Sequence, residues 1–303
     1  MRLTIRELER RCQKPDHRRV GNWMARRITR PAALRITRLA APLGVTAHAA
    51  TLGAWGVGLG AAAALAWGTP AGWLLGAAML QLWYLLDHVD GQLARLRGTA
   101  SLDGVQLDYL MHHTLNLLVP VGAGWGLVVA RAEPLWAAAG LIWGVATLVI
   151  TLKHDARYKA FVQRLKRLRG RLEVVGGGGA RPTPQPLLPR SPLRLAARLG
   201  RKTCEMHVVM NSVTALAAIQ LLTGDSRLLL ASLYVAAMAA LSAGVVAWDI
   251  VQSQRRQQAE HEFAAWYRVP AGQQMTFRDG WWITQSAQDT QDGQHGDKPH
   301  CPA

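Results

Sequence analysis

The sequence predicts an all-α integral membrane protein with six transmembrane helices and an N-terminal amphipathic helix at the membrane surface. Half of the 303 residues are apolar, and they occur in long runs instead of the interrupted, periodic pattern of a soluble domain. Each run has the length of roughly 17 to 25 residues that a helix needs to cross the hydrocarbon core of a bilayer. The runs cover, approximately, residues 49–68, 71–87, 106–130, 134–152, 205–223 and 227–251.

The distribution of basic residues predicts the orientation of these spans. Residues 1–38 hold twelve Lys and Arg against three acids, and residues 153–202 hold 14 against two. The three short loops between the other spans hold only Arg131 and Arg227. Because Lys and Arg accumulate on the cytoplasmic side, we expect both termini and the loop between spans four and five to lie there, in a bacterial-type inner or plasma membrane.

The net charge of +16 bears on the class of partner. Such a charge could attract nucleic acid, but here it flanks membrane spans, where anionic lipid attracts it instead. We therefore expect contact with anionic membrane lipid and no nucleic acid. Cys12, Cys204 and Cys301 are too far apart in the sequence to favour a disulfide framework or a zinc site.

The composition divides the chain into three parts. Residues 1–44 form a cytoplasmic N-terminal segment, residues 45–251 the six-helix membrane domain, and residues 252–303 a cytoplasmic tail. Within the membrane domain, residues 153–203 form a long basic loop. Its Gly- and Pro-rich part, residues 173–190, contains "GGGGARPTPQP" and predicts a disordered hinge.

Several basic segments outside the spans have an amphipathic pattern. Residues 20–44 predict a helix lying in the membrane interface before the first span. The stripe from Phe161 to Leu172 predicts either a second surface helix or an extension of span four, and a third amphipathic piece covers 191–203. The polar tail is expected to be weakly ordered beyond Ile283.

The charged stretch between the second and third runs, "LLDHVDGQLARLRGTASLDGVQLDYLMHH", is the main candidate for a functional site. At 100° per residue, its polar side chains form two stripes on consecutive helices, and Ser101 or Asp103 would cap the second helix. The turn between the helices would let the stripes face each other. The first stripe holds Asp87, Asp90, Gly91, Ala94 and Arg95, and the second holds Gly104, Asp108 and His112.

Carboxylates at this depth predict a bound divalent cation. An ionised side chain near the hydrocarbon core costs a few kcal/mol unless it is paired or bound to metal. Oxygen ligands favour Mg²⁺, Mn²⁺ or Ca²⁺ over Zn²⁺. The small residues Gly91, Ala94 and Gly104 would leave both stripes open to a bulky ligand. A metal pair together with Arg95 would suit a pyrophosphate.

These residues resemble the signature of the CDP-alcohol phosphotransferase (CDP-alcohol phosphatidyltransferase) family, D-x2-D-G-x2-A-R-x8-G-x3-D-x3-D. Seven of its eight fixed positions match in identity and spacing, from Asp87 to Asp108. "VTAHAATL" at 45–52 also resembles the family's "LTPNxxTL" before the first span, with departures at Ala47 and His48. The resemblance covers about residues 20–250.

The resemblance implies a six-helix membrane enzyme of phospholipid biosynthesis. Such enzymes transfer a substituted phosphate from a CDP-linked donor, often CDP-diacylglycerol, to an alcohol and release CMP. It implies two Mg²⁺ or Mn²⁺ ions and a possible homodimer. The carried-over roles are metal ligation by Asp87, Asp90 and Asp108, and binding of the CDP donor by Asp87, Gly91, Ala94, Arg95 and Gly104.

His112 stands where the family has its fourth aspartate, which ligates metal and deprotonates the acceptor hydroxyl. Histidine can be a base near neutral pH and can also ligate a metal, so His112 is a candidate for both roles, with Asp108 beside it as the second catalytic residue. If His112 is the base, His112→Ala abolishes turnover and leaves the affinity for CDP intact. The alternative is a family relative that binds CDP-lipid or partners without turnover. A transporter is disfavoured because no broken helix or repeat is visible.

Other polar residues allow two interpretations each. Lys153 and Arg157 could bind a phosphate of the acceptor or of a lipid, or could only orient span four. Asn211 and Asp249 could line the cavity or form hydrogen bonds between helices. The acceptor stays open among glycerol phosphate, inositol or its phosphate, serine and another lipid.

Overall fold

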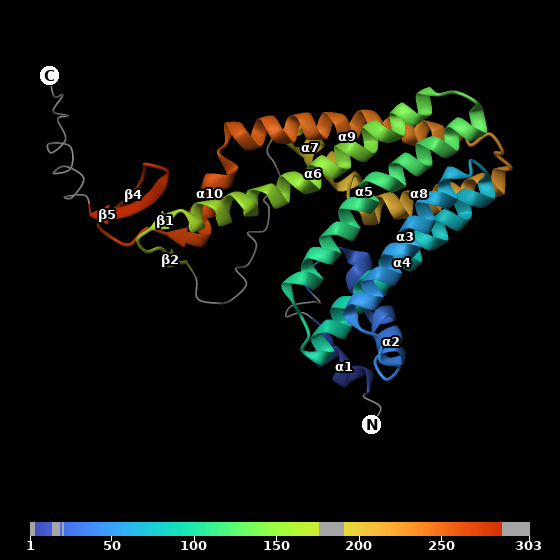
Figure 1. Cartoon of the computed structure of the whole chain (residues 1–303). Coiled ribbons are helices and arrows are strands. Elements are labelled where there is room, and N and C mark those ends of the chain that lie inside the picture. Colours follow the sequence, from blue (N-terminus) through green and yellow to red (C-terminus); the bar gives the residue numbers. More distant parts are fainter. Residues whose placement is uncertain (1–3, 14–18, 20, 176–190, 287–303) are drawn as a thin grey trace, which may run out of the picture. The chain divides into compact units, whose positions relative to one another are not determined.

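The computed structural model describes residues 4–13, 19, 21–175 and 191–286 of the chain (Figure 1). The described chain is mostly helical and divides into two compact units. Unit 1 comprises Met1–Val149 and Ala196–Val246, and unit 2 comprises Ile150–Leu195 and Ala247–Ala303. The candidate site lies in unit 1.

Six long helices account for the six apolar runs. Among the described residues, five of them are long and apolar enough to cross a membrane, whereas α4 does not reach that apolarity. The second half of α4 carries the first polar stripe, which lowers its mean hydropathy. These five helices identify the chain as an integral membrane protein. The helices are α3 (Ala47–Ala66), α4 (Pro70–Arg97), α5 (Leu102–Arg131), α6 (Leu135–Lys166), α8 (Met206–Thr223) and α9 (Leu229–Arg255).

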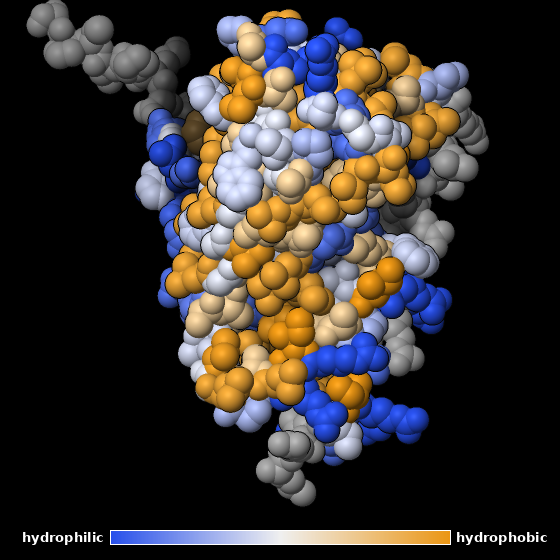
Figure 2. Space-filling model, turned by 90° about the vertical axis from the view of Figure 1, so that its right-hand side faces the viewer, coloured by the Kyte–Doolittle hydropathy of each residue, from blue (hydrophilic) through white to orange (hydrophobic). Residues whose placement is uncertain are grey.

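The outward faces of the unit 1 helices are apolar. Figure 2 shows one face of the molecule that is largely covered by apolar side chains. Leu74 on α4, Leu222 on α8 and Leu233 on α9 are among the exposed large side chains. Such faces are suited to lipid tails, which are as apolar as leucine.

Three short helical elements precede α3: α1 (Ile5–Cys12), the π-helix η1 (Ala25–Thr29) and α2 (Arg30–Ala40). Thr4 and Glu7 form a reciprocal capping box that starts α1, because each side chain satisfies the other's backbone N–H. The predicted amphipathic segment 20–44 is thus helical over η1 and α2, while the sequence analysis missed α1.

This N-terminal segment is bound to α4 by polar contacts that are buried or partly buried. The Thr37 hydroxyl lies 2.8 Å from Gln92 Oε1, and Gln92 Nε2 donates to the Arg30 carbonyl at 3.2 Å. Asn22 Nδ2 donates to the Tyr84 hydroxyl at 2.8 Å. The segment is therefore part of the wall of unit 1.

Small residues let α5 pack directly on α3. A Cβ atom added at Gly122 would lie 2.3 Å from the Ala62 carbonyl oxygen, and one at Gly126 would lie 2.1 Å from that of Leu65. No side chain fits at such distances, so the two backbones are in van der Waals contact. Small residues four apart are a usual means of close helix approach in membranes.

α4 and α8 are joined by a polar contact within the apolar bundle. Gln81 Nε2 lies 3.1 Å from Asn211 Oδ1 and 3.0 Å from the Thr214 hydroxyl. Of the two interpretations for Asn211, the structure shows the hydrogen bond between helices.

The turn between α4 and α5 has a defined geometry at both ends. Gly98 ends α4 in the left-handed region at φ 65°, and the Thr99 N–H donates to the Ala94 carbonyl at 2.9 Å. Ser101 caps α5 by accepting from the Gly104 N–H at 3.1 Å, so Ser101 and not Asp103 is the cap. This turn brings the two polar stripes to the same end of the helix pair.

The mostly helical structure is consistent with the all-α prediction, but unit 2 adds short strands that the prediction did not include. Strand β5 pairs in parallel with β1 and antiparallel with β4, and β2 pairs antiparallel with β3. Asp279 and Gly280 both have positive φ and form the two-residue turn of the β4–β5 hairpin. The strands are β1 (Leu168–Arg169), β2 (Glu173–Val174), β3 (Tyr267–Arg268), β4 (Gln273–Arg278) and β5 (Trp281–Ser286).

Two further predictions concern helices next to the basic loop. The first part of the predicted stripe, from Phe161 to Leu165, is an extension of α6, which continues to Lys166, whereas Leu168 lies in β1 and Leu172 in no helix. The helix α7 (Pro192–Thr203) coincides with the third amphipathic piece. Of the predicted hinge, 173–174 belong to β2, and residues 176–190 lie outside the described residues.

An arginine links α6 to the rest of unit 2. The Arg164 guanidinium donates to both carboxylate oxygens of Glu260 on α10 (Gln258–Trp266), at 2.6 and 2.5 Å. It also lies 4.7 Å from the ring centre of Phe263 and 4.1 Å from that of Trp282. One side chain thus joins the helix α10 and the strand β5 through an ion pair and two cation–π contacts.

We predict that Gly126→Ala destabilises the helix bundle by about 1–3 kcal/mol, because its methyl group would overlap the Leu65 carbonyl. The measurement is the unfolding midpoint in mixed detergent micelles. Gly56→Ala on α3 is the matched control, since its added methyl group meets no atom within 4 Å. Equal midpoints for the two variants would contradict the close packing of α3 and α5.

We predict that α10 loosens in acid. The hydrogen bond from Arg164 lowers the pKa of Glu260 from its ordinary value of 4.5. A lowered pKa in the folded state means that the pair stabilises unit 2 above the ordinary value, and that this contribution is lost as the pH falls through the lowered pKa. Because Glu260 is 56% exposed, the effect should stay below about 1 kcal/mol.

The measurement is hydrogen exchange of α10 between pH 6 and pH 3, corrected for the intrinsic rate. Glu260→Gln should exchange faster at pH 6 and lose the acid-dependent step. Retention of that step in Glu260→Gln would assign it to another group.

Candidate active site

A cavity of about 350 Å³ lies in unit 1 where α4 turns into α5. Residues from α3, α4, α5 and the N-terminal segment line it. All eight residues of the two predicted stripes are among them: Asp87, Asp90, Gly91, Ala94, Arg95, Gly104, Asp108 and His112. The structure therefore brings together every candidate residue of the charged stretch.

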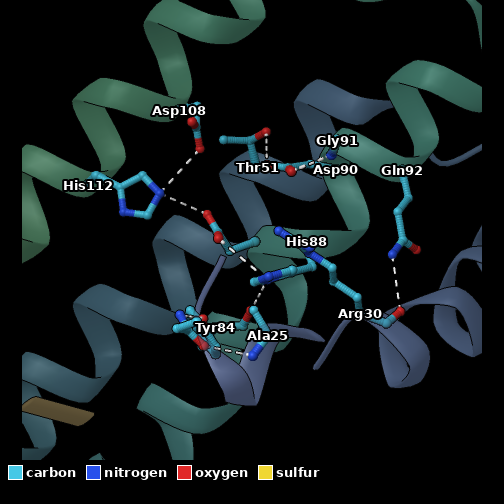
Figure 3. Close-up of polar contacts among 12 residues, drawn as sticks. Ala25, Arg30, Thr51, Tyr84, His88, Asp90, Gly91, Gln92, Asp108 and His112 are labelled. Atoms are coloured by element: carbon cyan, nitrogen blue, oxygen red, sulfur yellow. Dashed lines mark hydrogen bonds and ion pairs between the residues drawn. The ribbon is translucent and has the colours of Figure 1, made fainter. Parts of the chain in front are cut away.

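One end of the cavity holds a group of three side chains able to bind a metal ion. The group consists of Asp87, Asp108 and His112. Each residue offers one ligand atom, and these three atoms lie within 4.8 Å of one another. His112 Nε2 is 3.0 Å from Asp87 Oδ1 and 3.5 Å from Asp108 Oδ1 (Figure 3). A single imidazole nitrogen thus lies between carboxylates from two helices.

The geometry of this group fits a six-coordinate ion. Ligand atoms at about 2.1 Å from an octahedral ion are separated by about 3.0 Å when they are adjacent. The distance from His112 Nε2 to Asp87 Oδ1 is of this size, while the distance to Asp108 Oδ1 is longer, and both also lie in the range of an ion pair between imidazole and carboxylate. The donor set is two carboxylates and one imidazole.

Burial differs among these groups. The side chain of Asp87 is 14% exposed, while those of Asp108 and His112 are 37% and 34% exposed. The rings of Trp83 and His112 pack in a T-shaped arrangement with their centres 5.5 Å apart, and Trp83 is buried. The group is therefore open to the cavity on one side and backed by an aromatic side chain.

Asp90 lies outside this group of three. Its Oδ2 accepts from the Thr51 hydroxyl at 2.7 Å, and its Oδ1 accepts from the Gly91 N–H. Asp90 is 8% exposed, and Figure 3 shows its carboxylate beside Thr51 of α3. Metal ligation by Asp90, expected from the resemblance, remains a prediction.

The other part of the cavity carries two guanidinium groups. Arg95 Nε donates to the Cys12 carbonyl at the end of α1, and Arg30 lines the cavity from α2. A Cβ atom added at Gly91 would lie 3.1 Å from Arg95 Nη1, so Gly91 lets the guanidinium lie against the helix one turn away. At Gly104 the nearest atom is Ser101 Oγ at 3.4 Å.

Several lining residues escaped the sequence analysis. Gln13 and Arg30 come from the N-terminal segment, and no spacing links them to residues of α4. His88 lies between two stripe residues, and its Nδ1 is 2.9 Å from the Tyr84 carbonyl oxygen. Thr51 belongs to the "VTAHAATL" segment, which was the one available signal for its position.

Lys153 and Arg157 belong to unit 2 and do not line this cavity. Lys153 Nζ donates to the Asp249 carboxylate and, at 3.1 Å, to its carbonyl; Arg157 Nη1 donates to Glu262 at 2.5 Å. For Asp249, the structure therefore shows the hydrogen bond between helices. A phosphate contact by Lys153 or Arg157 remains a prediction.

Comparison with known proteins adds no assignment, since no protein-family model and no curated protein matches the chain significantly. The resemblance to the CDP-alcohol phosphotransferase signature consequently depends on the residues themselves.

We predict that Mn²⁺ raises the unfolding temperature of the protein. A ligand at 100 times its dissociation constant stabilises the folded state by about 2.7 kcal/mol. Asp87→Asn and Asp108→Asn should each remove most of this gain, because they delete a charged ligand. Asp103→Asn, an exposed neighbour outside the cavity, is the matched control and should keep it. No gain in the wild type would contradict the metal site.

Proposed function

We propose that this protein is a metal-dependent phosphotransferase of the membrane. It moves a substituted phosphate, such as a phosphatidyl group, from a CDP-linked donor to an alcohol and releases CMP. The observation that carries the proposal is the cavity itself. All eight positions of the signature line it, and three of them form the metal-binding group.

The reaction needs three groups near one another. The acceptor's hydroxyl oxygen forms a bond to the phosphorus that is transferred, the bond from that phosphorus to the CMP oxygen breaks, and CMP leaves with the electron pair. The hydroxyl proton passes to a base. A divalent ion bound by Asp87, Asp108 and His112 would neutralise charge on the phosphate oxygens.

The guanidinium groups suit the phosphates of the donor. Arg95 is held by the Cys12 carbonyl and lies over Gly91, so its position is fixed before a ligand binds. Arg30 adds a second positive charge to the same cavity. Planar guanidinium groups bind phosphate oxygens in pairs, which supports a pyrophosphate in this part of the cavity.

The membrane arrangement that we propose has six spans, with α4 as the second. α4 packs between α3 and α8, and its first half is apolar. With six spans, the basic N-terminal segment, the basic loop that follows α6 and the C-terminal tail lie in the cytoplasm. The metal group then lies at the cytoplasmic end of α4 and α5, where soluble acceptors and CMP can exchange.

His112 supports a second candidate function, a relative that binds a CDP-linked lipid without turnover. The fourth carboxylate of the signature is absent, and His112 Nε2 faces both Asp87 and Asp108. If that nitrogen ligates metal, it cannot also accept the proton of the acceptor. Only the transferase releases CMP, so CMP release distinguishes the two functions.

We predict that purified protein in vesicles releases CMP from CDP-diacylglycerol when Mn²⁺ or Mg²⁺ and an accepted alcohol are supplied. The alcohols are glycerol 3-phosphate, inositol, inositol phosphate and serine, and mass spectrometry of the lipid product identifies the acceptor. Asp90→Asn should lower the rate by at least about 100-fold, because the resemblance implies that the Asp90 carboxylate ligates a metal ion. Asp103→Asn should not change it. Binding of CDP-diacylglycerol without CMP release would favour the second function.

A further inference from the structure

We propose that His112 makes this site selective for transition-metal ions that accept imidazole, such as Mn²⁺ and Co²⁺, over Mg²⁺. The inference deepens the proposed function, since it concerns the ion used in the same cavity. It assigns the selectivity to one nitrogen atom, His112 Nε2, bound together with the carboxylates of Asp87 and Asp108.

The contacts of His112 point to ligation. Its Nε2 is 3.0 Å from Asp87 Oδ1 and 3.5 Å from Asp108 Oδ1, and one ligand atom of each of the three residues lies within 4.8 Å of the others, which is close enough to surround one ion. The ring packs against buried Trp83, with centres 5.5 Å apart, which restricts its orientation. An ion placed among the three atoms would therefore meet the nitrogen without a rearrangement of helices.

The chemistry of this donor set disfavours Mg²⁺. Mg²⁺ prefers six oxygen ligands in a regular octahedron, whereas imidazole nitrogen suits transition-metal ions. A fourth carboxylate at position 112 would give an all-oxygen set. The histidine replaces one of those oxygens and also removes one negative charge from the group.

The charge balance favours one ion at this group. Two carboxylates and a neutral imidazole carry a charge of about −2, which a single divalent ion neutralises. Asp90 does not add to this group, because the Thr51 hydroxyl and the Gly91 N–H hold its carboxylate.

The test uses Mn²⁺ alone, bound to the purified full-length protein. Pulsed electron paramagnetic resonance should detect coupling of the Mn²⁺ electron spin to a ¹⁴N nucleus in the wild type. His112→Asp restores a carboxylate at this position and should abolish that coupling. His113→Gln, a neighbouring histidine that does not line the cavity, is the matched control and should keep it.

Calorimetric titration gives a second, independent readout. The ratio of the Mn²⁺ affinity to the Mg²⁺ affinity should fall by about tenfold or more in His112→Asp, because the nitrogen ligand is lost. His113→Gln should leave the ratio unchanged. Absence of ¹⁴N coupling in the wild type, or an equal affinity ratio in the wild type and His112→Asp, would overturn the proposal.

The outcomes separate this inference from the proposed function. Nitrogen coupling in a protein that releases no CMP with any alcohol would leave the metal assignment standing and remove the transferase. CMP release supported equally by Mg²⁺ and Mn²⁺, without nitrogen coupling, would do the reverse. The coupling is measured on wild-type protein, so the test does not depend on the folding of a variant.

Discussion

The free-energy cost of holding carboxylates at the end of an otherwise apolar helix pair determines the architecture around the cavity. An ionised aspartate at this depth must be hydrogen-bonded, paired or bound to metal. The structure meets this requirement in two ways: Thr51 and the Gly91 N–H hold Asp90, whereas His112 lies between Asp87 and Asp108. The neighbours of each carboxylate, and not its place in the sequence pattern, decide what it can do.

Close helix packing sets the distance between α3 and α5, which both line the cavity. Gly122 and Gly126 allow α5 to contact the backbone of α3, and α3 carries Thr51. The glycines lie toward the opposite end of α5 from the cavity, yet the separation of the two helices depends on them. A stabilising contact in the apolar part of the bundle therefore sets the geometry of the polar part.

Sequence reasoning found what depends on local geometry. The stripes on α4 and α5 follow from 100° per residue, and the apolar runs follow from the thickness of a bilayer. The orientation of Asp90 was not predictable, because its partner Thr51 is 39 residues away. Nor were Arg30 in the cavity wall or the pairing of Lys153 with Asp249, which depend on contacts between distant segments. The β4–β5 hairpin is different, because its Asp279–Gly280 turn is a local signal that the prediction of a weakly ordered tail overlooked.

Because Arg95 donates to the Cys12 carbonyl, the position of its guanidinium depends on the residue at which translation starts. Translation started at Met24 instead of Met1 would still produce every long helix, together with the whole charged stretch from Asp87 to His112. Such a shortened product would keep the five apolar helices and the side chains of Asp87, Asp108 and His112. It would nevertheless lack α1, the backbone acceptor that positions Arg95, and Gln13 in the cavity wall.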